Sequence, residues 1–171
     1  GHGSVYRATD TNLDRPAAVK IFPGRQTGDS IATLRAEASA LREVKHDHIV
    51  GFYRFEVAND CAWLAMEWVD GESAANRIRR DERLPESDVL AILRDVLDGL
   101  HAVHRAGIVH RDLTAGNVIL RRKDNRAVLS DFGLAQPEGR SSTDATGRVH
   151  GTGPYIAPEC WRGEPADAKS D

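Results

Sequence analysis

The 171-residue sequence predicts an α+β fold of two lobes, a small antiparallel β-lobe with one helix and then a mainly helical lobe. Strand-like alternation dominates residues 1–69, where only one segment has helical periodicity, and a long amphipathic segment follows in the second half. We therefore divide the chain into lobes spanning 1–69 and 70–171. Two lobes create a cleft between them, which is the usual position of a functional site.

The first lobe is expected to contain two hairpins and a helix. Residues 4–9 and 17–22 alternate as strands, and the turn-forming sequence DTNLDRP separates them. Apolar residues at helical spacing then predict a helix over 30–45. Two more alternating runs, 49–57 and 61–69, predict a second hairpin.

The second lobe is expected to begin with a turn at DGES (70–73) and to be dominated by one helix. Apolar residues recur at helical spacing over 89–103, after the start signal LPESD and before the stop signal Gly107. A short strand is expected at 127–130. The Ser-, Thr- and Gly-rich segment 139–153 predicts a long loop.

Composition excludes several classes of partner. The net charge of −3 provides no basic field for nucleic acid, and no run of 18 apolar residues could span a bilayer. Cys61 and Cys160 are far apart without metal-ligand spacing, which favours a reduced, cytoplasmic compartment. The chain starts at Gly1 and its single methionine is Met66, so we expect an internal piece of a longer protein. Any membrane attachment would then lie outside this piece.

The stretch IVHRDLTAGNVIL (108–120) places polar side chains between two apolar runs. Asp112 and Asn117, and Asp131 further on, lie at the edges of such runs, so we expect them to face the cleft. Their oxygens suit Mg²⁺, and a carboxylate that does not bind the metal could accept a proton from a hydroxyl nucleophile. For each residue alone, a cap or a turn is an equally good interpretation.

A second charged pair is predicted in the first lobe. Glu37 lies between Leu34 and Leu41 on the apolar stripe of its helix, where a carboxylate needs a cation. Lys20, on the strand 17–22, is the candidate cation. The pair could position an anionic ligand, or it could be a structural salt bridge.

The motifs VHRDLTAGN, SDFGLA and IAPE, in this order, resemble the catalytic loop, the metal-binding motif and the end of the activation segment of protein kinases. AAVK resembles the strand that carries the nucleotide lysine, KHDHIV the turn after the following helix, and MEWVDG the hinge. GHGSVYRATD resembles the tail of the glycine-rich loop, with Gly3 as its third glycine. The resemblance covers nearly the whole chain and is greatest to bacterial kinases of the eukaryotic (Hanks) type, and GTGPYIAPE resembles the serine/threonine form.

The resemblance implies transfer of the ATP γ-phosphate to Ser/Thr hydroxyls of protein substrates, with ATP and Mg²⁺ as cofactors. Asp112 would be the catalytic base, and Asn117 and Asp131 the Mg²⁺ ligands. Lys20 would hold the phosphates and be steadied by Glu37. The adenine-binding residues would be Val5, Ala18 and Ile119 around the ring, Met66 behind it, and Glu67 and Val69 through their backbone groups.

The resemblance also implies supporting roles. His110 would be a packed scaffold residue, Asp171 would anchor the catalytic loop, and Thr152 would lie near the base. Arg111 would receive a phosphate from the activation loop, and homodimers could form for autophosphorylation. The candidate phosphorylation sites are Ser141, Ser142, Thr143 and Thr146.

Thr114 departs from the family pattern, because serine/threonine kinases usually have lysine there. A pseudokinase that serves as a scaffold is therefore one alternative, and a small-molecule phosphotransferase of the antibiotic-kinase type is another. We expect the first two loop glycines and the remainder of the helical lobe to lie outside this sequence. We therefore expect the piece alone to be poorly stable and inactive.

Overall fold

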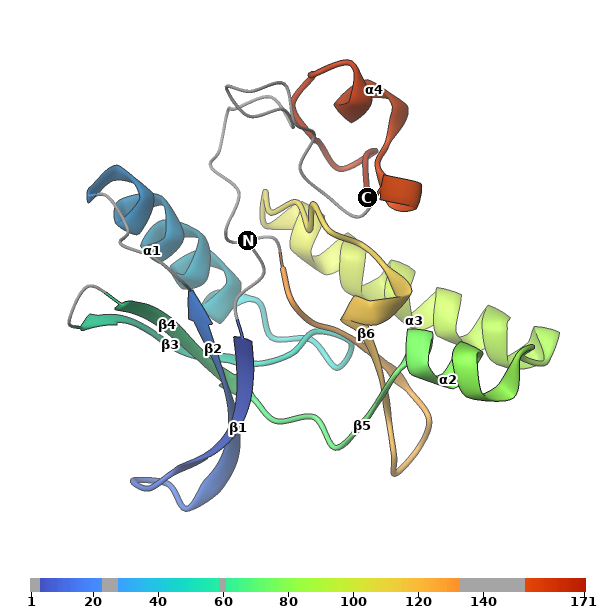
Figure 1. Cartoon of the computed structure of the whole chain (residues 1–171), viewed down its shortest axis with the longest axis horizontal. Helices are drawn as coiled ribbons and strands as arrows, with labels where there is room; N and C mark the ends of the chain where they lie inside the picture. The colour runs from blue at the N-terminus through green and yellow to red at the C-terminus, as the bar shows by residue number, and fades with distance from the viewer. Residues whose placement is uncertain (1–3, 23–27, 59–60, 133–152) are drawn as a thin grey trace.

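The computed structural model describes residues 4–22, 28–58, 61–132 and 153–171. Figure 1 shows two groups of elements: a four-stranded sheet with one helix, α1, and a second group in which α2 and α3 accompany a small sheet. The segment that carries β5 connects the two groups. The predicted α+β architecture is confirmed.

The first sheet has the strand order β1-β2-β4-β3, and all its pairs are antiparallel. Alternate residues of β4, Ala62, Leu64 and Met66, are buried because one face of the sheet packs into the core. Both predicted hairpins are confirmed, since β1 pairs with β2 and β3 with β4. The strands are β1 (Ser4–Asp10), β2 (Arg15–Phe22), β3 (Phe52–Ala58) and β4 (Cys61–Glu67).

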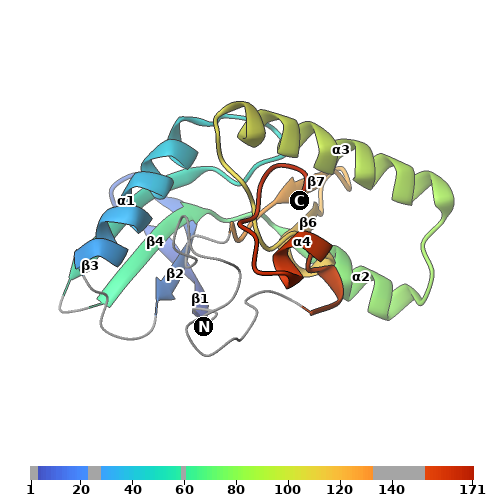
Figure 2. The same cartoon turned by 90° about the horizontal axis from the view of Figure 1, so that it is seen from above.

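Helix α1 (Gly28–Glu43) covers one face of this sheet (Figures 1 and 2). It begins and ends two residues earlier than the predicted 30–45. Leu34, Ala38 and Leu41 are buried along the stripe that the periodicity predicted. Glu37 is partly buried beside them, so its carboxylate is on the inner side of the helix.

The strand predicted over 49–57 starts only at Phe52, and this correction has a clear physical cause. Ile49 forms a parallel bridge to Leu129, and the Val50 amide donates to the Leu129 carbonyl at 2.9 Å. The backbone of these two residues therefore pairs with β7 (Ala127–Leu129) of the second group. The connection from α1 to β3 joins the two groups of elements.

The second sheet has the strand order β5-β6-β7, and α3 lies along it (Figure 2). Its strands are β5 (Gly71–Ser73), β6 (Val118–Arg121) and β7 (Ala127–Leu129). The helices are α2 (Ala74–Asp81), α3 (Glu86–Arg105) and α4 (Pro158–Trp161), with short 3-10 turns η1 (Ala115–Asn117) and η2 (Gly153–Tyr155).

Two of these elements differ from expectation. The segment DGES does not form only a turn, because Gly71–Ser73 pair with β6 as a strand. A Cβ on Gly71 would lie 2.2 Å from the Leu120 carbonyl oxygen, so only glycine allows this approach. Helix α2 was not predicted. The Ser73 side chain caps it by accepting from the Asn76 amide at 3.2 Å.

The long helix α3 confirms the predicted start and stop signals. It begins after Pro85, and Gly107, with φ of 74°, follows its C-terminus in the left-handed region. Val96 and Leu100 are buried, whereas Leu93 is 50% exposed and Leu97 63% exposed. None of the helices in the described ranges has the length and apolar character needed to cross a bilayer. The predicted loop 139–153 lies outside the described residues except for Gly153.

Candidate active site

Asp171 holds the start of the polar stretch 108–120. Its carboxylate accepts hydrogen bonds from the backbone amides of His110, at 2.7 Å, and Arg111, at 2.8 Å. The His104 Nε2 lies 2.8 Å from the same carboxylate. The Asp171 side chain is only 1% exposed, so these contacts replace its hydration. The predicted anchoring role of Asp171 is confirmed.

His110 is a fully buried scaffold residue, as predicted. Its ring packs on Phe132 with centroids 4.5 Å apart, and Phe132 in turn packs edge-on against Phe52. Burial lowers the pKa of His110, so its ring is neutral. Its Nδ1 accepts from the Asp112 amide at 3.3 Å, and its Nε2 faces the Ser130 carbonyl at 3.0 Å. His110 therefore links Ser130, which precedes the predicted metal ligand Asp131, to the backbone of the predicted base Asp112.

Asp112 and Asn117 lie together, as expected. The Asn117 amide nitrogen donates to the Asp112 carboxylate at 2.9 Å and to the Asp112 carbonyl at 2.8 Å. Thr114, between them, caps η1 by accepting from the Gly116 amide at 3.2 Å. The Asn117 carbonyl accepts from the Ser130 amide at 2.9 Å, which fixes this loop to the end of β7. The segment from Asp112 to Asn117 thus forms one hydrogen-bonded unit, which we call the Asp112–Asn117 unit.

Lys20 and Asp131 bring the two groups of elements together. The Lys20 Nζ, on β2, lies 3.1 Å from an Asp131 carboxylate oxygen, two residues beyond β7. The Lys20 side chain is 12% exposed and that of Asp131 is 32% exposed. This partly desolvated pair combines a cation suited to phosphate with a carboxylate suited to a divalent metal.

Glu37 has a different partner from the predicted one. Its carboxylate lies 2.6 Å from the Arg111 guanidinium, and both side chains are mostly buried. The predicted Lys20–Glu37 ion pair is therefore wrong for this structure, where each member contacts another charge. The physical reason is that Asp131 neutralises Lys20, while Arg111 of the second group supplies the cation that the Glu37 carboxylate needs.

Arg111 and Asp131 both have left-handed backbone conformations, with φ of 66° and 57°. Such conformations cost about 1–3 kcal/mol for a residue with a side chain and persist only where surrounding contacts enforce them. Asp171 holds the Arg111 amide, and the preceding strand β7 holds Asp131. Asp14, Glu82 and Asn125 have similar φ values elsewhere in the described ranges, so two of five such residues lie at the candidate site. Arg111 directly precedes the Asp112–Asn117 unit, and Asp131 follows Ser130, whose amide binds the Asn117 carbonyl.

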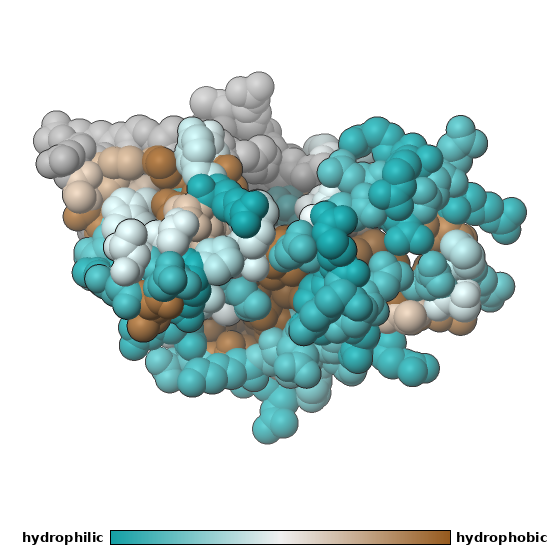
Figure 3. All heavy atoms as spheres, turned by 90° about the horizontal axis from the view of Figure 1, so that it is seen from below, coloured by the Kyte–Doolittle hydropathy of each residue, from teal (hydrophilic) through white to brown (hydrophobic). Residues whose placement is uncertain are grey.

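The predicted adenine-binding residues come from both groups. Ala18 and Met66 are buried opposite one another on β2 and β4, and Ile119 and Val69 are partly buried. Val5 on β1 is 46% exposed. The Glu67 amide already donates to the Gly51 carbonyl at 2.7 Å, so a ligand would have to use its carbonyl. Hydrophobic atoms are visible between the hydrophilic surfaces of the two groups in Figure 3.

The side-chain oxygens of Asn117 and Asp131 fit a magnesium ion that keeps water and phosphate ligands better than a metal ion bound entirely by protein side chains. No group of three or more His, Cys, Asp or Glu side chains in the described ranges could hold a metal. Asn117 and Asp131 supply two oxygen-bearing side chains on segments joined through the Asn117–Ser130 hydrogen bond. Magnesium commonly binds through one or two protein groups, with water and phosphate completing its shell.

Several predicted residues lie outside the described part of the chain. They are Gly3, Ser141, Ser142, Thr143, Thr146 and Thr152.

Sequence reasoning missed a polar cluster in which the buried side chains of His48 and Asp95 contact the half-exposed Arg126. A signal was present in the sequence. Asp95 lies next to Val96 and four residues before Gly99, on the same helical face as the buried apolar residues. A carboxylate on such a face needs partners, as was argued for Glu37.

Comparison with known proteins gives a consistent result. The family model described as protein kinase domain matches residues 1–171. The serine/threonine-protein kinase PknL of Mycobacterium tuberculosis is 36% identical over 173 residues, covering 100% of this chain and 43% of that protein. The serine/threonine-protein kinase PknA of Corynebacterium glutamicum is 32% identical, covering 100% of this chain and 38% of that protein. The chain therefore spans less than half the length of these relatives.

The solved structures agree with the sequence relatives. The crystal structure of the Mycobacterium tuberculosis PknI kinase domain matches with a TM-score of 0.80 and 26% identity. The match covers 100% of this chain and 64% of that one. A single-substitution mutant of the same kinase domain gives a TM-score of 0.79 over 99% of this chain. The bilobal fold predicted from the motifs is thereby confirmed.

Proposed function

Because this chain belongs to the protein kinase family, we propose that the full protein transfers the γ-phosphate of ATP to Ser or Thr hydroxyls of protein substrates. Members of the family generally use ATP and Mg²⁺. The observation that carries the proposal is the link between the Lys20–Asp131 pair and the Asp112–Asn117 unit, made by the hydrogen bond from the Ser130 amide to the Asn117 carbonyl. Groups suited to binding phosphate, binding a metal and accepting a proton thus come from both groups of elements.

We assign to Asp112 the role of general base. Its carboxylate is oriented by Asn117 and its backbone amide by His110, so it can receive a hydroxyl proton in a fixed direction. It also aligns the oxygen for attack on phosphorus. Thr114 supports this geometry as a cap. The lysine commonly found at that position would supply a cation, so here Lys20 and the metal must offset the charge of the triphosphate.

We assign to Asn117 and Asp131 the role of holding Mg²⁺, which supplies charge neutralisation and positions the phosphates when bound. Lys20 contacts the phosphates in the same step. Since Lys20 and Asp131 neutralise one another in the structure, each must exchange its partner when nucleotide and metal bind.

We also propose the boundary between residues 69 and 70 as the division of the two lobes. It lies between β4 and β5, which belong to different sheets. The adenine-binding set then spans the boundary, with Ala18 and Met66 on one side and Ile119 on the other.

The test uses the full-length protein, Mg²⁺ and labelled ATP, with Ser-, Thr- and Tyr-containing peptides and a free amino sugar as acceptors. We expect label on Ser or Thr peptides, and about 10²–10⁴-fold lower turnover in Asp112→Asn. Asp98→Asn, on the exposed side of α3, is the matched control and should transfer at the wild-type rate. Absence of transfer to any acceptor would indicate a pseudokinase, and label only on the amino sugar would indicate a small-molecule phosphotransferase.

A further inference from the structure

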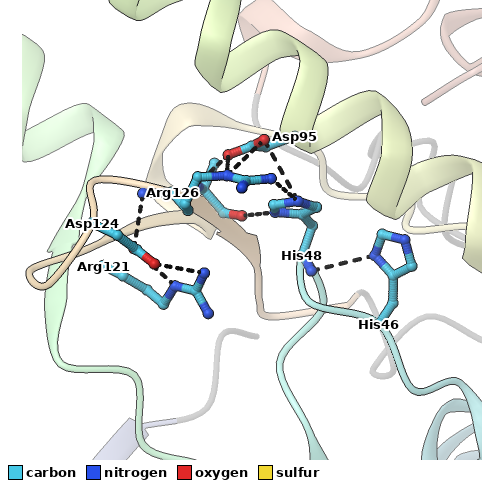
Figure 4. Close-up of polar contacts among 7 residues, drawn as sticks. His46, His48, Asp95, Arg121, Asp124 and Arg126 are labelled. Atoms are coloured by element: carbon cyan, nitrogen blue, oxygen red, sulfur yellow. Dashed lines mark hydrogen bonds and ion pairs between the residues drawn. The ribbon is translucent and has the colours of Figure 1, made fainter.

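The His48–Asp95–Arg126 cluster joins three segments of the chain (Figure 4). His48 belongs to the connection between α1 and β3, Asp95 to α3, and Arg126 immediately precedes β7. His48 is 4% exposed and Asp95 5% exposed. The Arg126 side chain is 51% exposed, so only His48 and Asp95 need hydrogen bonds to replace their hydration.

The contacts define where the protons lie. The His48 Nδ1 is 2.7 Å from the Ala127 carbonyl oxygen, so it donates. The Nε2 lies 2.6 Å from the Arg126 Nη2 and accepts from it. Arg126 Nε also donates to both Asp95 oxygens, at 3.1 and 2.9 Å. His48 is thus a neutral bridge between a carbonyl and a guanidinium.

The surroundings favour this charge arrangement. Burial raises the pKa of Asp95. The hydrogen bonds from the Arg126 side chain and the Ala127 amide, together with the charge of Arg126, outweigh burial and lower the pKa below its usual range. The other titratable groups close to the cluster are His46, Asp47 and Asp124. His46 Nδ1 accepts from the His48 amide at 3.3 Å. The cluster therefore contains one ion pair, Asp95–Arg126, joined by one neutral imidazole.

All of these contacts converge on β7. Asp95 accepts from the Ala127 amide at 3.0 Å while His48 binds the Ala127 carbonyl. The His48 carbonyl accepts from the Leu129 amide at 2.9 Å. Gly99 lets α3 approach, since a Cβ there would lie 2.9 Å from the His48 carbonyl oxygen. One edge of β7 is therefore held by β6 and the other by the cluster.

We propose that His48 and Asp95 are positioning residues that set β7, and through it Asp131, for the phosphotransfer proposed above. Asp131 follows Leu129 by two residues and has a left-handed backbone, so its carboxylate direction depends on where β7 ends. Ion pairs with hydrogen bonds accept a narrow range of geometries, unlike an apolar contact. Only the expected effect of the cluster on metal binding rests on the proposed function. The effect of the cluster on β7 can be measured without any catalysis.

The experiment compares His48→Ala and His48→Asn in the full-length protein, with His101→Ala on the exposed side of α3 as the matched control. The asparagine amide nitrogen is as many bonds from the backbone as Nδ1, so it can still donate to the Ala127 carbonyl. Backbone amide exchange at Ala127 and Leu129 is measured first. We expect it to rise about tenfold or more in His48→Ala, less in His48→Asn, and not at all in the control.

The second measurement is the Mg²⁺ dependence of phosphate transfer. We expect the apparent KM for Mg²⁺ to rise about tenfold in His48→Ala, with kcat at saturating Mg²⁺ nearly retained. His48→Asn should lie between His48→Ala and the wild type. A merely structural role would lower the melting temperature and leave the Mg²⁺ dependence of the folded enzyme unchanged.

Two results would overturn the proposal: unchanged exchange at Ala127 and Leu129, or an unchanged Mg²⁺ KM in a folded, active His48→Ala protein. Should His48→Ala fail to fold, the same comparisons on His48→Asn decide. If even the wild-type protein transfers no phosphate, the proposed function fails. Amide exchange then decides separately whether the cluster positions β7.

Discussion

Asp171 offers the sharpest test of how the candidate site is built. Asp171→Ala would remove the acceptor of two backbone amides, His110 and Arg111, and of the His104 ring. An amide that loses its only buried partner costs about 1–3 kcal/mol, so two such amides give a loss of about 2–6 kcal/mol. That loss is a large share of the stability of an ordinary domain, about 5–15 kcal/mol.

A conservative variant refines the estimate. In Asp171→Asn the carboxamide oxygen can still accept from a backbone amide, whereas its nitrogen cannot. We therefore expect about half of the loss seen in Asp171→Ala. Asp98→Asn, an exposed carboxylate on α3, should change stability by less than about 0.5 kcal/mol.

Urea unfolding of the full-length protein measures these differences, provided that the slope of the transition is unchanged. Turnover should fall together with stability in Asp171→Ala, because Arg111 would lose the contact that holds its left-handed backbone next to Asp112. A loss below about 1 kcal/mol in Asp171→Ala would show that water replaces the carboxylate, and the reasoning about buried amides would be wrong.

Three further predictions concern single positions. Thr114→Ala removes the cap on the Gly116 amide and should cost about 0.5–2 kcal/mol in urea unfolding, whereas Thr114→Ser should not. Thr114→Lys loses the same cap, so any rise in turnover from its cation should accompany a lower melting temperature. Gly71→Ala should cost about 1–3 kcal/mol in urea unfolding, because its Cβ meets the Leu120 carbonyl; an unchanged midpoint would contradict the close β5–β6 approach. Because the folded pKa of Asp95 is lowered, its stabilisation is present above the usual value of 3.8 and is lost as pH falls through the folded value. Melting temperatures between pH 3 and 7 should therefore fall more steeply in the acid range for the wild type than for Asp95→Asn.

Periodicity predicted the elements whose partners are local. The first hairpin, α1 and α3 show strong strand or helix patterns, and their positions agree within about two residues at most ends. Strand β5 was missed because Gly71–Ser73 has no pattern of its own and becomes a strand only by pairing with β6. Helix α2 was missed because its polar sequence NRIRRD lacks an apolar stripe, so that its cap was the main available signal.

The site was predicted residue by residue but not contact by contact. Motif order predicted Lys20, Asp112, Asn117 and Asp131 as site residues, and in the structure they form two pairs linked by the Ser130–Asn117 hydrogen bond. Whether Glu37 meets Lys20 or Arg111 depends on how α1 sits against the second group, and no local pattern encodes that. The same holds for His48, whose partners lie 47 and 78 positions away, as the sequence numbers of Asp95 and Arg126 show.

The Lys20–Asp131 pair has a consequence for the order in which ligands bind. Under the proposed roles, nucleotide phosphate would compete with Asp131 for Lys20, and a divalent ion would compete with Lys20 for Asp131. Either ligand breaks the pair and so removes the obstacle to the other. By thermodynamic linkage, metal and nucleotide must then raise each other's affinity by the same factor, even before any direct contact between them is counted. The Lys20–Asp131 salt bridge would thus make the two proposed ligands cooperative.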